Sequence, residues 1–122
     1  MDEATFKHRT KLLGLQAIRL AATLPRYSFS DILSRQLVRS ATSVGANYRA
    51  ACRSQSRRDM ISKMSIVEEE SDETMYWLEL MVEGGIVKSE SVDDLMRDAD
   101  EILAMTHASI RTLRHLNLKS KI

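Results

Sequence analysis

The sequence predicts an all-α fold, an antiparallel up-down-up-down four-helix bundle, from three observations. The 122-residue chain has one proline, four glycines and only 5% aromatic residues, whereas strands are enriched in aromatic and β-branched residues. Apolar residues recur at helical spacing in four stretches. Short breaks separate these stretches, so consecutive helices are expected to be antiparallel. We expect a single domain over residues 1–122, with helices at about 4–24, 29–54, 57–83 and 92–115.

Capping and breaking residues predict where the helices begin and end. The first helix carries an apolar stripe and ends before Pro25, because the residue preceding a proline disfavours the helical conformation. Ser28, Ser56 and Ser91 are each followed three residues later by an aspartate, which is typical of a helix N-terminus. The glycine pair at 84–85 then supplies the end of the third helix.

The second predicted helix has a core face and, on the opposite side, a face rich in arginine. With about 100° per residue, its apolar residues lie about half a turn from its arginines. The apolar residues are Leu33, Leu37, Ala41, Val44, Tyr48, Ala51 and Cys52. Five arginines fall within about 80° of one another, and the tight turn at residues 55–56 brings a sixth beside them. Together they form the arginine stripe: Arg35, Arg39, Arg49, Arg53, Arg57 and Arg58.

The third predicted helix carries more apolar residues than one buried side requires. Ile66, Trp77 and Leu80 lie apart from its main apolar side, and Glu70 and Glu73 share the flank of Trp77. A helix of an isolated four-helix bundle buries only one side. We therefore expect these five residues to form a subunit interface, with deep burial within the chain as the alternative.

The fourth predicted helix has its apolar residues near heptad spacing. They are Val92, Leu95, Ala99, Ile102, Thr106, Ile110 and Leu113. This spacing favours bundle packing at a shallow crossing angle.

The net charge of +1 conceals a strong partition along the chain. Residues 26–63 carry eight basic and two acidic residues, a balance of +6, whereas residues 64–101 carry two basic and thirteen acidic residues, a balance of −11. Such blocks serve either pairing between helices of an assembly or the binding of polyanions.

The composition predicts a cytoplasmic protein. A single cysteine excludes an internal disulfide framework, and Cys52 lies on the apolar face of its helix, where it is expected to be a core residue rather than a reactive thiol. The N-terminus lacks the features of a signal peptide, and no apolar stretch reaches membrane-spanning length, so no membrane partner is expected.

The sequence contains no motif for a catalytic, metal or cofactor site. Di-iron helix bundles place a glutamate three residues before a histidine, but the residues three before the histidines are Thr5, Ala104 and Thr112. The sequence also has no Gly-rich phosphate loop and no nucleophile elbow. We expect a protein that is not an enzyme and uses no cofactor.

The arginine stripe is the remaining functional candidate, and two interpretations stay open. It can track the phosphate backbone of RNA or DNA, and Arg57 and Arg58 favour this because cations in the first turn of a helix oppose its dipole unless an anion binds. Alternatively, the stripe serves solubility and pairs with the acidic third helix of another subunit. The stripe has no neighbouring aromatic residues for stacking, so nucleic-acid binding would be directed at the backbone.

The run RSATSVGANYR at residues 39–49 resembles the signature of the bacterial four-helix bundle proteins first noted in intervening sequences of large-subunit ribosomal RNA genes. The resemblance continues at residues 56–57, 61–63 and 73–80. It implies a ring-like homopentamer, and it extends to the accessory variability determinant of diversity-generating retroelements, which binds nucleic acid and a reverse transcriptase. The chain departs from the pattern at Ala50, where the family usually has glutamate, and at Met60, where it has an aromatic residue.

Two functions are therefore expected as alternatives. The first is a non-enzymatic, oligomeric module that binds RNA or DNA through the arginine stripe. The second is a protein interaction scaffold with no role in nucleic-acid binding, in which the basic second helix meets the acidic third helix of another subunit.

Overall fold

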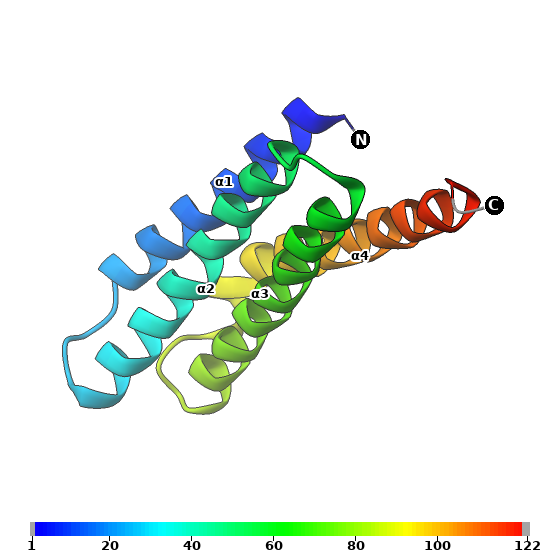
Figure 1. Ribbon diagram of the computed structural model, residues 1–122. Coiled ribbons are helices and arrows are strands. Elements are labelled where there is room, and N and C mark those ends of the chain that lie inside the picture. Colours follow the sequence, from blue (N-terminus) through cyan, green and yellow to red (C-terminus); the bar gives the residue numbers. More distant parts are fainter. Residues whose placement is uncertain (1, 121–122) are drawn as a thin grey trace.

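The protein is an antiparallel bundle of four α-helices. The computed structural model describes residues 2–120, and the side chains of residues 2–116. The helices are α1 (Glu3–Ala22), α2 (Ser28–Cys52), α3 (Arg57–Glu83) and α4 (Ser89–Ser120). Figure 1 shows that each helix runs opposite to the one before it, and no strand occurs within the described range. The predicted all-α four-helix bundle is confirmed.

The predicted boundaries agree with the structure in the middle of the chain and differ at its ends. The third helix spans the predicted residues, and the first two end two residues early, at Ala22 and Cys52. The fourth helix was predicted at 92–115, and both of these limits are wrong. It begins at Ser89 and continues to Ser120, because residues 116–120 contain neither proline nor glycine to stop it.

One of the three predicted serine caps is present. The hydroxyl of Ser56 accepts a hydrogen bond from the backbone N–H of Asp59 at 3.0 Å. Ser28 is instead the first residue of α2, after an N-cap residue whose side chain makes no capping hydrogen bond. Ser91 lies inside α4, where its N–H donates to the carbonyl of Lys88 one turn earlier. A Ser-x-x-Asp sequence therefore locates a helix start only to within about one turn.

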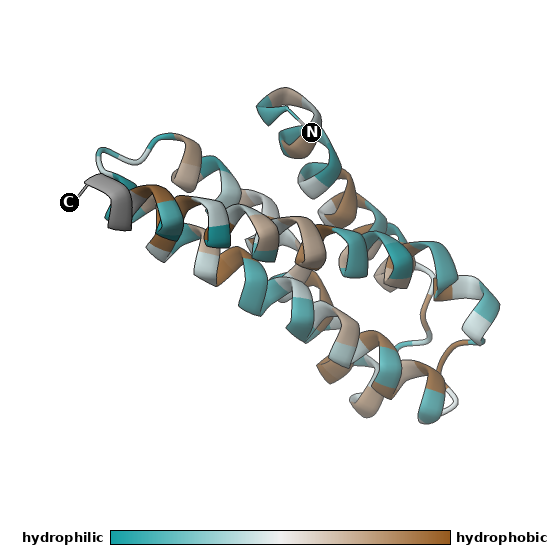
Figure 2. Cartoon of the chain, turned by 90° about the vertical axis from the view of Figure 1, so that its right-hand side faces the viewer, coloured by the Kyte–Doolittle hydropathy of each residue, from teal (hydrophilic) through white to brown (hydrophobic). Residues whose placement is uncertain are grey.

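The buried core lies between the apolar stripes of all four helices. α2 packs against α1 and α3, and α3 packs against α4, whereas α1 and α4 share far fewer contacts. Figure 2 shows hydrophilic and hydrophobic residues on every helix, as expected for amphipathic helices around one core. Side chains that are at most 1% exposed include Leu13, Leu37, Val67, Leu78 and Ile102.

α1 and α2 approach closely at two glycines, and the closer contact is at Gly45. A Cβ atom added at Gly14 would lie 3.4 Å from the Cα atom of Thr42, and one added at Gly45 would lie 3.2 Å from the carbonyl oxygen of Thr10. This crossing fixes how α2 rotates about its own axis, and so determines which of its residues face solvent. Within the described part of the chain, no helix has the length and apolar character needed to cross a bilayer.

Candidate nucleic-acid interface

The arginine stripe lies on the solvent side of α2 and at the beginning of α3. All six of its residues are exposed, whereas Leu37, Ala41 and Val44 on the opposite side of α2 are 0% exposed. The amphipathic pattern of α2 continues along the whole helix and produces this separation, because residues half a turn apart face opposite directions. The guanidinium groups therefore lie outside the protomer.

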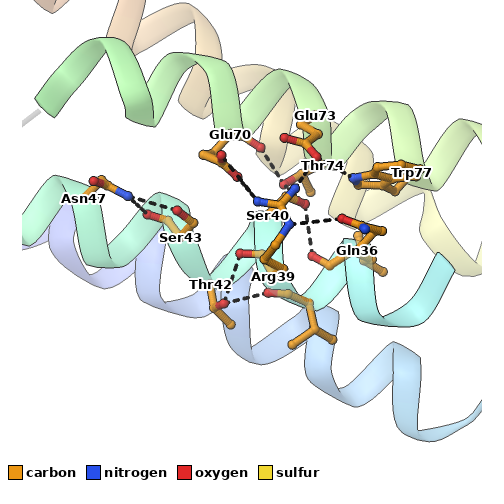
Figure 3. A network of polar contacts seen from close by, with 12 residues as sticks. Gln36, Arg39, Ser40, Thr42, Ser43, Asn47, Glu70, Glu73, Thr74 and Trp77 are labelled. Carbon is orange, nitrogen blue, oxygen red and sulfur yellow. Dashed lines mark hydrogen bonds and ion pairs between the residues drawn. The ribbon is translucent and has the colours of Figure 1, made fainter. Parts of the chain in front are cut away.

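Arg39 differs from its neighbours in the stripe, because it is held by two carboxylates of α3. Its Nη1 atom lies 3.1 Å from Oε2 of Glu70, and its Nη2 atom forms an ion pair with Glu73. Its Nε atom donates to Gln36 Oε1 at 3.0 Å. Figure 3 shows Arg39 reaching from α2 to both carboxylates. Two carboxylates thus compensate its charge within the chain.

A small polar network joins α2 and α3 around this arginine. Glu73 also accepts a hydrogen bond from the indole N–H of Trp77 at 3.1 Å. The hydroxyls of Thr74 and Ser40, both 0% exposed, lie 3.1 Å apart beneath the ion pair. Burial raises the pKa of the Glu70 carboxyl, and the nearby Arg39 charge opposes that shift. The network therefore costs desolvation at Glu70 and recovers part of that cost through Arg39.

Arg35, Arg49 and Arg53 have no acidic partner among the described residues. They are spread over α2 from its second turn to its C-cap. Arg58 is exposed in the first turn of α3, where Ser56 caps the helix and Asp59 is the acidic residue. These side chains are available to an external anion.

The structure adds basic residues of α1 that sequence reasoning missed. Lys7, His8 and Lys11 line an open groove of about 510 Å³ between α1 and α2, and Arg49 lines it from the other side. Lys7 also lies 3.5 Å from Glu3, one turn earlier on the same helix. The spacing of Lys7 and Lys11, four residues apart, was the signal that could have indicated this surface.

The apolar residues of α3 that were predicted to form an interface are partly exposed, but other apolar residues of the chain are more exposed. Ile66, Trp77 and Leu80 are half-buried, and Trp77 packs against the core. The neighbouring Tyr76 is 51% exposed. On α2, Phe29 and Ile32 are 70% and 58% exposed, which the sequence analysis did not single out, although their spacing of three residues places them on one face.

The remaining reactive side chains have structural surroundings. Burial raises the pKa of the half-buried Cys52 thiol, which disfavours the reactive thiolate at neutral pH. The Nδ1 atom of His107 lies 2.9 Å from Glu68 on the surface. No group of three or more metal-binding side chains of His, Cys, Asp or Glu occurs among the described residues.

Comparisons with known proteins agree with the fold. The model of the 23S rRNA-intervening sequence protein family matches residues 4–108. A search of curated proteins found no match. A crystal structure of a protein of unknown function from the S23 ribosomal protein family of Bacteroides thetaiotaomicron is 32% identical, with a TM-score of 0.84, and the match covers 91% of this chain and 99% of that one. The chain belongs to the 23S rRNA-intervening sequence protein family.

Proposed function

We propose that this protein is a non-enzymatic, oligomeric module that binds the phosphate backbone of RNA or DNA through the arginine stripe. The observation that supports this most directly is the exposure of Arg35, Arg49 and Arg53 along one side of α2, with no carboxylate partner among the described residues. From Arg35 to Arg53 the helix rises about 27 Å. A strand of duplex nucleic acid carries one phosphate per about 3.4 Å of axis, so the stripe can follow about eight phosphates.

Arg39 has a different role in this proposal. Its guanidinium is shared between Glu70 and Glu73, so its contribution to phosphate binding is reduced. It instead joins α2 to α3. The phosphate contacts are carried by Arg35, Arg49 and Arg53, and Arg57 and Arg58 extend the surface onto the start of α3. A bound phosphate there also relieves the unfavourable interaction of these cations with the dipole of α3.

The binding is expected to be poorly selective for sequence. Between Arg35 and Arg53 the only aromatic residue is Tyr48, which is 7% exposed and packs edge-to-face on Phe6. Without an exposed ring in this stretch, the surface reads phosphates rather than bases.

Oligomerisation is the second part of the proposal. The ring-like homopentamer implied by the family resemblance presents five stripes on one particle, which raises the apparent affinity for a long polyanion. The exposed Phe29 and Ile32, which share one face of α2, and the exposed Tyr76 of α3 support self-association, because a second copy that covers them removes their apolar surface from water. Five copies of the 13.9-kDa chain have a mass of about 70 kDa, which light scattering measures directly.

The experiment compares two triple variants with the same change in charge. Arg35→Glu, Arg49→Glu and Arg53→Glu together remove the stripe, whereas Arg19→Glu, Arg111→Glu and Arg114→Glu reverse exposed arginines of α1 and α4. Fluorescence anisotropy with labelled single-stranded RNA and duplex DNA is measured between 50 and 200 mM salt, as the range over which phosphate contacts are screened. The first variant is expected to lose binding and the second to retain most of it. Equal losses in both variants, or full retention in the first, would overturn the proposal.

A further inference from the structure

The outer face of α3 carries a row of carboxylates with a tyrosine at its centre. The members are Glu69, Asp72, Tyr76, Glu79 and Glu83. Their spacing of three and four residues places them on one side of the helix, and all five are exposed. None of the four carboxylates forms an ion pair among the described residues. We refer to these five residues as the acidic row.

The groove between α1 and α2 has complementary chemistry. Lys7 and Lys11 lie at one end, and Arg49 adds a third cation from α2. At the other end the groove is lined by Leu15 and Ile18, which are 40% and 46% exposed. Small residues of both helices line the middle of the groove: Gly14, Thr42, Gly45 and Ala46. This basic groove can therefore receive an aromatic side chain beside a set of carboxylates.

We propose that the basic groove of one copy binds the acidic row of a second copy of this chain. This proposal rests on the self-association proposed above and names the surfaces that carry it. Tyr76 packs on Leu15 and Ile18, and its neighbouring carboxylates meet the lysines of α1. The two surfaces carry opposite charges, and both have an exposed apolar group at the matching place.

The axial spacings of the two surfaces agree. Lys11 and Lys7 lie four and eight residues from Leu15, about 6 and 12 Å along α1. Asp72 and Glu69 lie four and seven residues from Tyr76, about 6 and 10.5 Å along α3. A helix that places its tyrosine on Leu15 therefore places two carboxylates within reach of two lysines.

The contact is heterologous, because it joins different surfaces of the two copies. After the first contact, one copy still has a free groove and the other still has a free acidic row. Further copies can therefore bind in the same orientation until the assembly closes into a ring. Only Arg49 belongs both to the groove and to the arginine stripe. Arg35 and Arg53 stay outside this contact and are left for nucleic acid.

A charge-swap experiment tests the contact. One variant carries Lys7→Glu and Lys11→Glu, and the other carries Glu69→Lys and Asp72→Lys, the two carboxylates that the spacing places opposite these lysines. Each variant alone meets like charge at every such contact, so light scattering is expected to show a fall from the wild-type mass to that of the monomer. Mixed in equal amounts, the two variants are expected to reassemble, because each reversed surface then finds its complement. The variant Arg111→Glu with Arg114→Glu, which reverses two exposed cations of α4, serves as the control and keeps the wild-type mass.

Three results would overturn the docking proposal: a monomeric wild type, a wild-type mass in either swapped variant, or a mixture that stays monomeric although circular dichroism shows both variants folded. A monomeric wild type would also be the result if the basic groove binds a different acidic molecule instead of a second copy. RNA binding is measured on the Lys7→Glu, Lys11→Glu variant, which keeps Arg35, Arg49 and Arg53. Retained RNA binding with a failed swap overturns only the docking. Loss of binding in the double variant Arg35→Glu, Arg53→Glu, which leaves the groove residues unchanged, is the separate test of the phosphate surface.

Discussion

Arg39 shows how a residue predicted from sequence for an external ligand is bound by its own chain. On a helical wheel it is indistinguishable from the other arginines of the stripe. In the folded chain it faces Glu70 and Glu73 across the junction of α2 and α3. That difference depends on the register of the two helices, which residue spacing within α2 does not contain. Among the stripe residues, Arg39 is therefore the one whose removal should affect stability first.

Glu70 gives a pH-dependent prediction at the same network. Its pKa is raised in the folded protein, mainly by burial, so the folded state binds a proton more tightly than the unfolded state. As pH rises from about the ordinary glutamate value of 4.5 through the higher folded pKa, the wild type loses stability relative to Glu70→Gln, which stays neutral. Urea unfolding between pH 4 and 8 is expected to show the variant gaining on the wild type by at most about 1 kcal/mol for a partly exposed group. A gap that moves the other way would mean that Arg39 outweighs burial.

At the scale of the elements, one serine cap can be tested against two matched serines. Ser56 accepts the N–H of Asp59 at the start of α3, so Ser56→Ala is expected to cost about 1 kcal/mol of unfolding free energy. Ser28 lies inside the first turn of α2, and Ser91 lies inside α4 without capping it. Ser28→Ala and Ser91→Ala are therefore expected to change stability by less than about 0.5 kcal/mol. Equal effects at all three positions in denaturant titrations would contradict this assignment.

The two helical glycines provide a second comparison between elements. Replacing a helical glycine with alanine ordinarily gains up to about 1 kcal/mol. At Gly14 the added Cβ lies 3.4 Å from Thr42, an ordinary contact, whereas at Gly45 it lies 3.2 Å from a rigid backbone carbonyl of α1. Gly14→Ala is expected to be neutral or stabilising, and Gly45→Ala to be less stable than Gly14→Ala by about 1 kcal/mol or more. Thermal unfolding of the two variants, measured side by side, checks the order.

The helices could be predicted from the sequence because the helical spacing of apolar residues continues over long stretches. Residues that typically end helices separate these stretches. Pro25 and the glycine pair at 84–85 lie close to actual helix ends. The serine caps were less informative, because Ser28 and Ser91 lie within helices that already begin at Ser28 and Ser89, so the Ser-x-x-Asp pattern alone did not identify the capping residue. The C-terminal end of α4 was missed because no proline or glycine stops the helix there. Its start was missed because Ser91 does not cap the helix, which begins at Ser89.

The candidate surface was predictable only in part. Exposure of the stripe followed from amphipathicity, but the pairing of Arg39 and the joining of Lys7 and Lys11 to Arg49 need the packing of α1, α2 and α3 together. The exposed Phe29 at the beginning of α2 was also missed. A helical wheel shows which residues share a face, but it does not show whether a neighbouring helix covers that face.

At the scale of the whole molecule, the blocks of charge along the chain give the helices different net charges. α1 and α2 together carry more basic than acidic residues, and α3 and α4 carry more acidic than basic residues, although Arg57, Arg58 and Lys63 of the basic block lie on α3. The net charge of +1 is thus the sum of a net positive contribution from α1 and α2, a net negative one from α3 and α4, and the charges outside the helices. The proposed binding of polyanions and of further copies of the chain is therefore expected to weaken as salt rises.

The bundle is also uneven in how firmly its helices are held. α2 and α3 each pack extensively against two neighbours, whereas α1 contacts α4 only sparsely. The main polar link between α1 and α4 is Arg9, whose Nη2 atom lies 2.7 Å from Glu101 and 3.7 Å from Asp98. Amides of α1 are therefore expected to exchange with solvent through local openings of lower free energy than those of α2 and α3.

Removing Arg9 should increase this difference without affecting the central helices. A half-exposed ion pair of this kind contributes up to about 1 kcal/mol, so Arg9→Ala is expected to speed exchange in α1 by about two- to fivefold and to leave α2 and α3 nearly unchanged. Arg19→Ala is the matched control, because Arg19 is an exposed arginine of the same helix and forms no ion pair among the described residues. Hydrogen exchange followed by mass spectrometry on peptides from each helix measures the effect. Equal acceleration in all four helices would show that α1 opens only when the whole bundle unfolds.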